Sequence, residues 1–329
     1  MGFMLTNIYT FSVYLPMILY FCMKKLQHMT FRSITRSMRL RTLPLSLAGV
    51  VLGIFLAAAD YRLKALTVVW LLLTTVCLQI LSNLSNELGD TLHGVDTDDR
   101  QGIRYSLQDG EMTVPQMKGL IGVIAGLCCV FGLLMIHSAF GSLFTPLSLV
   151  FIALGGAAIW AAMHYTLGKN PYGYRGLGDI FVFLFFGIVT VCGGYFICAH
   201  EIPTPLLLLP AAAIGGFSVA VLNVNNIRDM KTDAKNRVTV AIRLGTRCAR
   251  IYQTILIVLG WVCMTVFCLL RFFSPWHFLY VLTLPLYIKH LHGVWTRADK
   301  ALDPMLPLLV IGTFLFALLG GIGFVVFLL

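Results

Sequence analysis

Acidic residues are scarce in this 329-residue chain, and they gather in two places. Half of its 14 Asp and Glu residues lie in the segment Glu87–Glu111, which begins at the end of a long hydrophobic run. Asn86 precedes Asp90 by four residues, so both side chains share one face of a helix. Asp96 lies off that face, and we expect Gly94 to turn the chain and bring Asp96 back toward Asp90. This segment therefore predicts a ladder of oxygen ligands at a helix end.

A second ladder follows another hydrophobic run. Asn226, Asp229 and Asp233 are spaced three and four residues apart, which again places them on one helical face. A further asparagine precedes each ladder by three residues: Asn83 stands before Asn86, and Asn223 stands before Asn226. The two segments therefore resemble a degenerate internal repeat.

Two carboxylate clusters that face each other repel unless a cation lies between them. Hard oxygen ligands in this number suit Mg²⁺, which takes its remaining ligands from water and phosphate oxygens. A diphosphate clamped between the two ladders is the predicted arrangement. An isolated aspartate near a helix end is more often loop polarity, and we assign Asp98, Asp99, Asp109 and Glu111 to that role. The predicted catalytic acids are Asp90, Asp96, Asp229 and Asp233, and the predicted metal ligands are these four together with Asn86.

The composition places the ladders in a membrane protein. The chain is 58% hydrophobic and only 12% charged, far from the mix of a soluble domain. A spanning helix needs about 20 apolar residues, which predicts an all-α bundle of about nine transmembrane helices. The expected spans are Leu43–Ala59, Leu66–Leu84, Met117–Ile136, Leu147–Leu167, Asp179–Cys198, Pro205–Val224, Ile251–Leu270, Trp276–Leu291 and Pro304–Leu329.

The basic residues orient this bundle. The net charge is +10, and all but three of the 24 Lys and Arg residues fall on one side of the expected spans, the exceptions being Arg62, Lys64 and Arg271. The positive-inside rule therefore predicts a multi-pass protein of the cell inner membrane with both ladders facing the cytoplasm. Because the basic residues alternate with spans, lipid headgroups are the expected partners and nucleic acid is excluded.

The first 30 residues are expected to stand apart from the transmembrane domain at 31–329. Met4–Met23 is apolar enough to span a membrane or to act as a signal-like segment. The alternative is that translation starts at Met23 or Met29.

Three motifs resemble the menaquinone-pathway branch of the UbiA superfamily of intramembrane aromatic prenyltransferases. They are Asn86-Glu-Leu-Gly-Asp90-x-x-x-Gly94-x-Asp96, Pro171-Tyr-Gly-Tyr-Arg-Gly-Leu-Gly-Asp179 and Asn226-Ile-Arg-Asp229-x-x-x-Asp233. The resemblance runs from about Phe31 to the C-terminus. Three features depart from the pattern: Gly94 replaces an acid of the general superfamily, Glu87 replaces a common Asp, and Lys235-Asn-Arg237 replaces Gly-Lys.

The resemblance implies a UbiA-type fold and a reaction. A polyprenyl group would pass from polyprenyl diphosphate to 1,4-dihydroxy-2-naphthoate with Mg²⁺ as cofactor. Diphosphate and CO₂ would leave, and the product would be demethylmenaquinone.

Further substrate contacts follow from residues near the ladders. Lys169 lies just beyond a span, where its amine either meets a phosphate oxygen or snorkels to the interface. Arg228 lies inside the second ladder and is expected to bind phosphate. Tyr165 and Tyr172 either stabilise an allylic cation or form an interfacial belt. The predicted substrate-binding residues are Asn86, Asn226, Arg228, Lys169, Tyr165 and Tyr172.

Two residues near the ladders are left out of the predicted site. Asp179 is either a helix cap or a ligand. His93 is expected to be a solvated loop residue.

Two other functions stay open. A related enzyme would use 4-hydroxybenzoate, homogentisate or haem as the acceptor. An ion-coupled transporter would also carry intramembrane acids, but such acids usually lie near the middle of the membrane rather than at its edge. The sequence predicts no oligomeric state.

Every motif lies downstream of residue 30, so removal of residues 1–28 is expected to leave prenyl transfer intact. The measurement is turnover of the purified truncated protein beside the full chain. A folded truncation without activity would show that the N-terminal segment belongs to the site.

Overall fold

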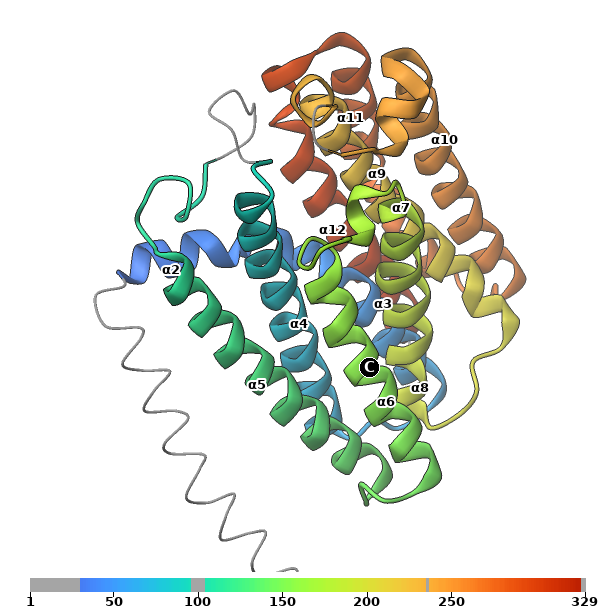
Figure 1. Cartoon of the computed structure of the whole chain (residues 1–329). Helices are drawn as coiled ribbons and strands as arrows, with labels where there is room; N and C mark the ends of the chain where they lie inside the picture. The colour runs from blue at the N-terminus through green and yellow to red at the C-terminus, as the bar shows by residue number, and fades with distance from the viewer. Residues whose placement is uncertain (1–29, 96–103, 235–236, 327–329) are drawn as a thin grey trace, which may run out of the picture.

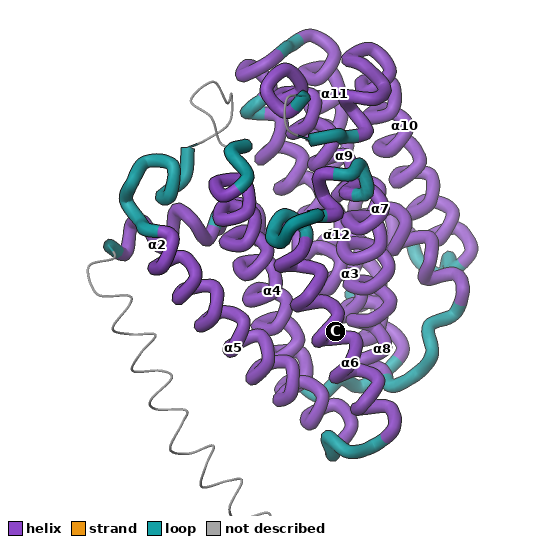
Figure 2. The backbone as a smooth tube through the Cα atoms, in the orientation of Figure 1, coloured by secondary structure: helices purple, strands orange, loops and turns teal. Residues whose placement is uncertain are grey.

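The computed structural model describes residues 30–95, 104–234 and 237–326. Within these ranges the chain is a bundle of helices without a β-sheet, and the isolated bridge between Arg175 and Val238 is the extended pairing that it contains (Figure 2). The predicted all-α class is therefore confirmed.

Eight helices among the described residues are long and apolar enough to cross a membrane. They are built from α2 (Phe31–Met38) joined to α3 (Leu43–Asp60), α4 (Ala65–Leu92), α5 (Val114–Phe140), α6 (Pro146–His164), α7 (Gly178–Val182) continuing through η3 (Phe183–Gly193) into α8 (Gly194–Ala199), α9 (Leu208–Asp233), α10 (Val240–Leu270) and α12 (Met305–Val325). Short 3₁₀ turns precede or follow several of them, at η1 (Leu40–Thr42), η2 (Tyr172–Tyr174), η4 (Pro205–Leu207) and η6 (Asp299–Leu302).

The ninth predicted span, Trp276–Leu291, is a composite element. It begins as the 3₁₀ helix η5 (Pro275–Thr283) and continues as α11 (Leu284–Thr296), which has 13 residues. Pro275 starts the first part and Pro285 lies at the start of the second, where a missing backbone N–H costs little. The predicted count of about nine is thus met by eight long helices and this pair.

Helices α4 and α9 extend past their predicted ends. The expected spans stopped at Leu84 and Val224, whereas α4 runs for 28 residues to Leu92 and α9 for 26 residues to Asp233. At 1.5 Å per residue each is about 40 Å long, more than the ~30 Å hydrocarbon core. Their last turns therefore reach the polar edge of the bundle, and these turns carry the two ladders.

Gly94 follows α4 with a left-handed backbone, φ 65°. A residue with a Cβ rarely adopts this conformation, so the turn predicted at Gly94 is confirmed. The position of Asp96 relative to the site lies outside the described residues.

Helix α2 lies crosswise to α4 and α5 near the end of the bundle that carries the ladders (Figure 1). Its chain turns into α3 at Arg39, which has a left-handed φ of 51°. Asp60 and Arg271 mark the opposite end, where their side chains form an ion pair at 2.6 Å.

Close helix contacts at small residues hold α9 in the middle of the bundle. A Cβ placed at Gly187 of η3 would lie 2.5 Å from the carbonyl oxygen of Ala211 and 2.8 Å from the Cα of Gly215. Small residues let helix backbones approach in a membrane, where lipid tails leave packing as a main source of association. The contact between Gly187 and Gly215 thus sets how near η3 comes to α9.

Gly187→Ala is therefore expected to lower the melting temperature of the purified protein, because overpacking at such a contact costs about 1–3 kcal/mol. Gly193→Ala is the matched control, since a Cβ at Gly193 in the same helix meets nothing within 4 Å. Thermal unfolding in detergent measures both variants. Equal melting temperatures would contradict the close packing.

Candidate functional site

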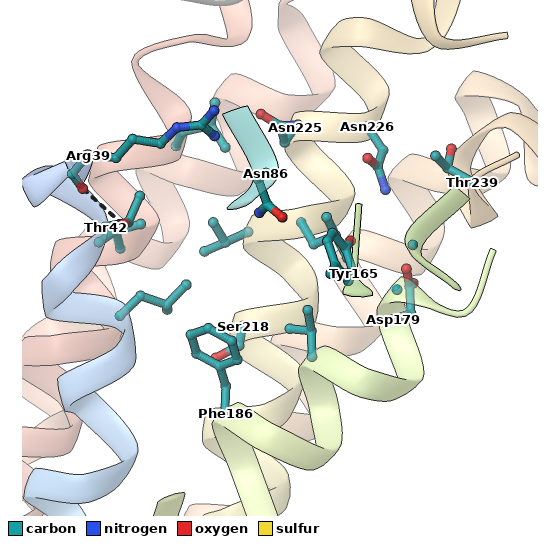
Figure 3. A pocket seen from close by; sticks show the side chains of 18 of the residues that line it. Arg39, Thr42, Asn86, Tyr165, Asp179, Phe186, Ser218, Asn225, Asn226 and Thr239 are labelled. Carbon is teal, nitrogen blue, oxygen red and sulfur yellow. Dashed lines mark hydrogen bonds between the residues drawn. The ribbon is translucent and has the colours of Figure 1, made fainter. Parts of the chain in front are cut away.

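A cavity of about 500 Å³ opens between the ends of α4 and α9, the α6–α7 connection and the start of α12. One end of it is polar and the other apolar (Figure 3). The polar residues of the lining include Arg39, Arg41, Asn86, Asp90, Tyr105, Tyr165, Asp179, Asn225, Asn226, Arg237 and Asp303, and the apolar ones include Leu45, Val182, Phe186, Val221, Leu222, Leu306 and Val310.

The first ladder faces this cavity. Asn86 and Asp90 both line it, and the side chain of Asp90 is buried. The Tyr174 hydroxyl donates to Asp90 Oδ1 at 2.7 Å. Thr166 donates from Oγ1 to Asn86 Oδ1 at 3.2 Å. The last turns of α4 therefore present one carboxylate and one amide whose orientations are set by hydroxyl donors.

The second ladder faces the cavity only in part. Asn226 lines it, whereas Asp229 and Asp233 lie behind the surface with 0% and 1% exposure. Arginine side chains reach both buried acids. Arg237 Nη2 donates to Asp233 Oδ2 at 2.6 Å, and Arg228 binds both oxygens of Asp229 at 2.9 and 2.6 Å. Each buried charge thus has an opposite charge beside it, as burial requires.

Arg228 also joins α9 to the start of α12. Its Nη1 donates to Asp303 Oδ1 at 2.7 Å, and its Nη2 donates to Asn225 Oδ1 at 2.8 Å. The side chain is 4% exposed, and it is not among the residues that line the cavity. The structure therefore shows Arg228 in a carboxylate network, and its predicted phosphate contact stays a prediction.

The two asparagines of each repeat have different roles, which their spacing in the sequence did not predict. Asn83 donates to the carbonyl of Met38 at 2.8 Å and to Thr42 Oγ1 at 2.9 Å. Its counterpart Asn223 donates to the carbonyl of Ala249 at 3.0 Å and to Gln253 at 2.8 Å. The first asparagine of each repeat thus binds a neighbouring helix, while the second lines the cavity.

The predicted tyrosines and lysine lie at different depths. Tyr165 lines the cavity. Tyr172 packs edge-on against it, with ring centroids 5.3 Å apart, and donates its hydroxyl to the carbonyl of Ala161. Lys169 is exposed in the loop after α6 and does not line the cavity. Substrate contacts from Tyr172 and Lys169 therefore stay predictions without support from the cavity lining.

The two residues left out of the predicted site, Asp179 and His93, both have defined contacts in the structure. Asp179 lies in the first turn of α7 rather than at its cap, lines the cavity and accepts a hydrogen bond from Tyr252 at 3.0 Å. The ring of His93 lies 2.9 Å from the carbonyl of Gly89 and 3.1 Å from that of Gly168. His93 is exposed and follows the last residue of α4, as expected for a solvated loop residue, and its ring also joins the end of α4 to the loop after α6.

Three residues of the cavity wall received no role from the sequence. Arg41 donates to the Tyr105 hydroxyl at 2.9 Å, and the guanidinium of Arg39 lies 3.7 Å from the centre of the Tyr105 ring. The Nε and Nη2 atoms of Arg39 are buried without a hydrogen-bond partner. The sequence could not link either arginine to Tyr105, which lies more than 60 residues away in the chain.

Ion pairs hold the loop that carries Tyr105. Arg36 of α2 binds Asp109 at 2.5 Å and Glu111 at 3.0 Å. Arg104 also donates to Asp109, and these arginines hold the pKa of Asp109 below its usual range. Asp109 and Glu111 are exposed loop residues that do not line the cavity, as their assignment to loop polarity predicts, and the structure adds that both hold the loop against α2.

The oxygen ligands of this cavity fit a hard dication that shares its coordination with a ligand. No three His, Cys, Asp or Glu side chains among the described residues converge as a complete metal centre. Asn86, Asp90 and Asn226 nevertheless bring three hard ligand side chains from two helices to one cavity. Mg²⁺ is held by few protein ligands and by phosphate oxygens, so this partial set suits it.

Comparison with known proteins shows the family to which the chain belongs. The sequence model of the UbiA prenyltransferase family matches residues 46–307. A 1,4-dihydroxy-2-naphthoate octaprenyltransferase of Escherichia coli (strain K12) is 39% identical over 289 residues, which are 87% of this chain and 93% of that protein. The enzyme of the same name from Haemophilus influenzae is 37% identical over 293 residues, 88% of this chain and 94% of that protein.

Solved structures agree with this placement. The apo structure of a UbiA homolog from Aeropyrum pernix K1 superposes with a TM-score of 0.65 at 14% identity, covering 90% of this chain and 99% of that chain. A likeness at this identity shows the fold alone. With the family match over most of the described residues, the chain belongs to the UbiA prenyltransferase family.

Proposed function

We propose that this protein transfers a polyprenyl group from polyprenyl diphosphate to 1,4-dihydroxy-2-naphthoate. The C–O bond between the allylic carbon and the diphosphate breaks, and the allylic carbon bonds to the ring carbon that carries the carboxylate. That carboxylate leaves as CO₂ and the ring keeps both hydroxyl groups, so the immediate product is demethylmenaquinol, the reduced form of demethylmenaquinone. The observation that carries the proposal is one cavity with an apolar end for a hydrocarbon chain and a polar end lined by Asn86 and Asp90 of the first ladder and Asn226 of the second.

Mg²⁺ is the proposed cofactor, and when bound it supplies positive charge that neutralises a departing diphosphate. Asn86, Asp90 and Asn226 are the residues that face the cavity and would hold it. Asp229 and Asp233 are paired with Arg228 and Arg237. For either acid to bind a cation, its arginine must exchange the carboxylate for phosphate oxygens, which suit the same planar guanidinium.

The apolar end of the cavity supports the rest of the proposal. Phe186 and Ser218 lie in this deeper part, below the labelled polar side chains in Figure 3. Apolar walls bury a hydrocarbon chain and keep water from an electron-deficient allylic carbon. Tyr165 lies between the two regions, where its ring can meet that carbon.

The relatives' names support the proposed acceptor, since 1,4-dihydroxy-2-naphthoate stands in the names of two relatives of which this chain covers 93% and 94%. An ion-coupled transporter is disfavoured, because the described ladders lie on the last turns of α4 and α9 rather than at mid-helix. We further propose that the ladder-bearing end faces the cytoplasm of the cell inner membrane, because the Lys and Arg residues gather there.

Product analysis tests the proposed function. Purified protein with Mg²⁺ and a polyprenyl diphosphate is expected to prenylate 1,4-dihydroxy-2-naphthoate, as shown by mass spectrometry, and to stop when EDTA removes the metal. Parallel reactions contain 4-hydroxybenzoate or homogentisate. Preferred prenylation of one of these, or full turnover in metal-free buffer, would overturn the acceptor or the metal requirement respectively.

Substitution of one acid in each ladder tests the shared site. Asp90→Asn and Asp229→Asn nearly preserve shape but remove a charge, and each is expected to lower turnover roughly a hundredfold or more, since each ~1.4 kcal/mol is tenfold. The double variant should be little worse than either single one, because residues that act as one unit are not additive.

Asp299→Asn is the control for those variants. Asp299 is half exposed and pairs with the exposed Lys231 at 2.9 Å, a surface contact of small energy. Its turnover is expected to stay within about twofold of the wild type. Near-normal turnover of a folded Asp90→Asn variant would contradict the proposed site formed by the two ladders.

A further inference from the structure

The segment that connects α6 to α7 touches both ladder regions through one residue. The Tyr174 side chain donates to Asp90 Oδ1 at 2.7 Å, at the end of α4. Its backbone carbonyl accepts the N–H of Val238 at 3.0 Å, in the segment just after α9. The bridge between Arg175 and Val238 is formed at the same place. Tyr174 is thus hydrogen-bonded to elements from both halves of the internal repeat.

This contact continues to the second ladder in one step along the chain. Val238 follows Arg237, whose guanidinium donates to Asp233 Oδ2 at 2.6 Å. Asp90 and Asp233 are therefore joined through Tyr174, Val238 and Arg237. The path crosses the polar end of the cavity, which Asp90 and Arg237 both line.

The backbone around Tyr174 is held closely. The N–H of Gly173 donates to the carbonyl of Tyr165 at 3.0 Å, and a Cβ at Gly173 would lie 2.6 Å from that oxygen. A larger residue does not fit there. The Tyr174 ring meets the His93 ring edge-on, with centroids 5.4 Å apart, and His93 in turn contacts the carbonyls of Gly89 and Gly168. The hydroxyl of Tyr174 is consequently aimed at Asp90 by packing on both sides.

We propose that Tyr174 is a positioning residue. It orients the carboxylate of Asp90 to bind a dication with diphosphate, and it fixes the position of Asp90 relative to the second ladder. This inference rests on the proposed function and deepens it. A hydroxyl that donates to one carboxylate oxygen directs the other lone pairs of that carboxylate, and loss of such a partner typically weakens metal binding ten- to a hundredfold. Tyr174 acts through Asp90 and needs no contact with the substrate.

The test is binding of Mg²⁺ with inorganic diphosphate, measured as stabilisation of the full chain against thermal unfolding in detergent. Tyr174→Phe removes only the hydroxyl. Its melting temperature without ligand is expected to stay close to that of the wild type, while the Mg²⁺ concentration for half-maximal stabilisation rises roughly tenfold or more. Steady-state turnover should show the same shift in its Mg²⁺ dependence.

Tyr195→Phe is the matched control. The Tyr195 hydroxyl also donates to an aspartate, Asp60 at 3.3 Å, but at the opposite end of the bundle. This variant should show no shift in Mg²⁺ dependence. His93→Ala is a second variant at an exposed residue, and it is expected to shift Mg²⁺ dependence in the same direction as Tyr174→Phe by several-fold, because it removes the ring that Tyr174 packs against.

The outcomes separate the two proposals. If the wild type is not stabilised by Mg²⁺ and diphosphate, the proposed function fails. If the wild type is stabilised but Tyr174→Phe and His93→Ala match it at every Mg²⁺ concentration, the positioning role of Tyr174 is overturned while the proposed function stands. A Tyr174→Phe variant that loses its fold leaves His93→Ala to decide in the same way.

Discussion

The structure depends on the neutralisation of buried carboxylates at the edge of a membrane bundle. Asp229 and Asp233 are almost fully buried, where an uncompensated charge costs several kcal/mol. Arg228 and Arg237 supply the compensation at 2.6 Å. The helices must therefore end where these pairs can form, and this requirement places the end of α9, the segment that follows it and the start of α12 around one cavity.

The same arginines suit the proposed chemistry. A guanidinium that binds a carboxylate has the geometry to bind a phosphate, so replacement of one partner by the other need not leave a buried charge alone. Removal of Arg228 or Arg237 would leave the buried carboxylate of Asp229 or Asp233 without that positive partner. In a site built in this way each buried acid of the second ladder has an arginine beside it, and the hydroxyl groups of Tyr174 and Thr166 orient Asp90 and Asn86 of the first ladder.

Long apolar runs predicted the all-α fold, and the four-residue spacing of Asn86 and Asp90 predicted the helical face that lines the cavity. The roles of individual ladder residues depended on contacts that spacing does not contain. Asn83 and Asn86 have the same side chain on neighbouring turns, yet one binds the chain before α3 and the other faces the cavity. Tyr105 lines the cavity on a loop that Arg36 holds through Asp109, and spacing along the chain does not report such a long-range contact. The division of the ninth predicted span into η5 and α11 was not predicted either, because hydropathy reports the length of an apolar segment and not its helix type.

The ladders on α4 and α9 are proposed to bind one metal-bound diphosphate between them. The most direct measurement is an experimental structure of the protein with Mn²⁺ in place of Mg²⁺ and a non-reactive prenyl diphosphate analogue, in which anomalous scattering locates the metal. The account predicts metal density beside Asp90 and Asn226, with the diphosphate between the two helices and the prenyl chain against Phe186. Metal bound at one helix alone, or a diphosphate outside this cavity, would contradict it.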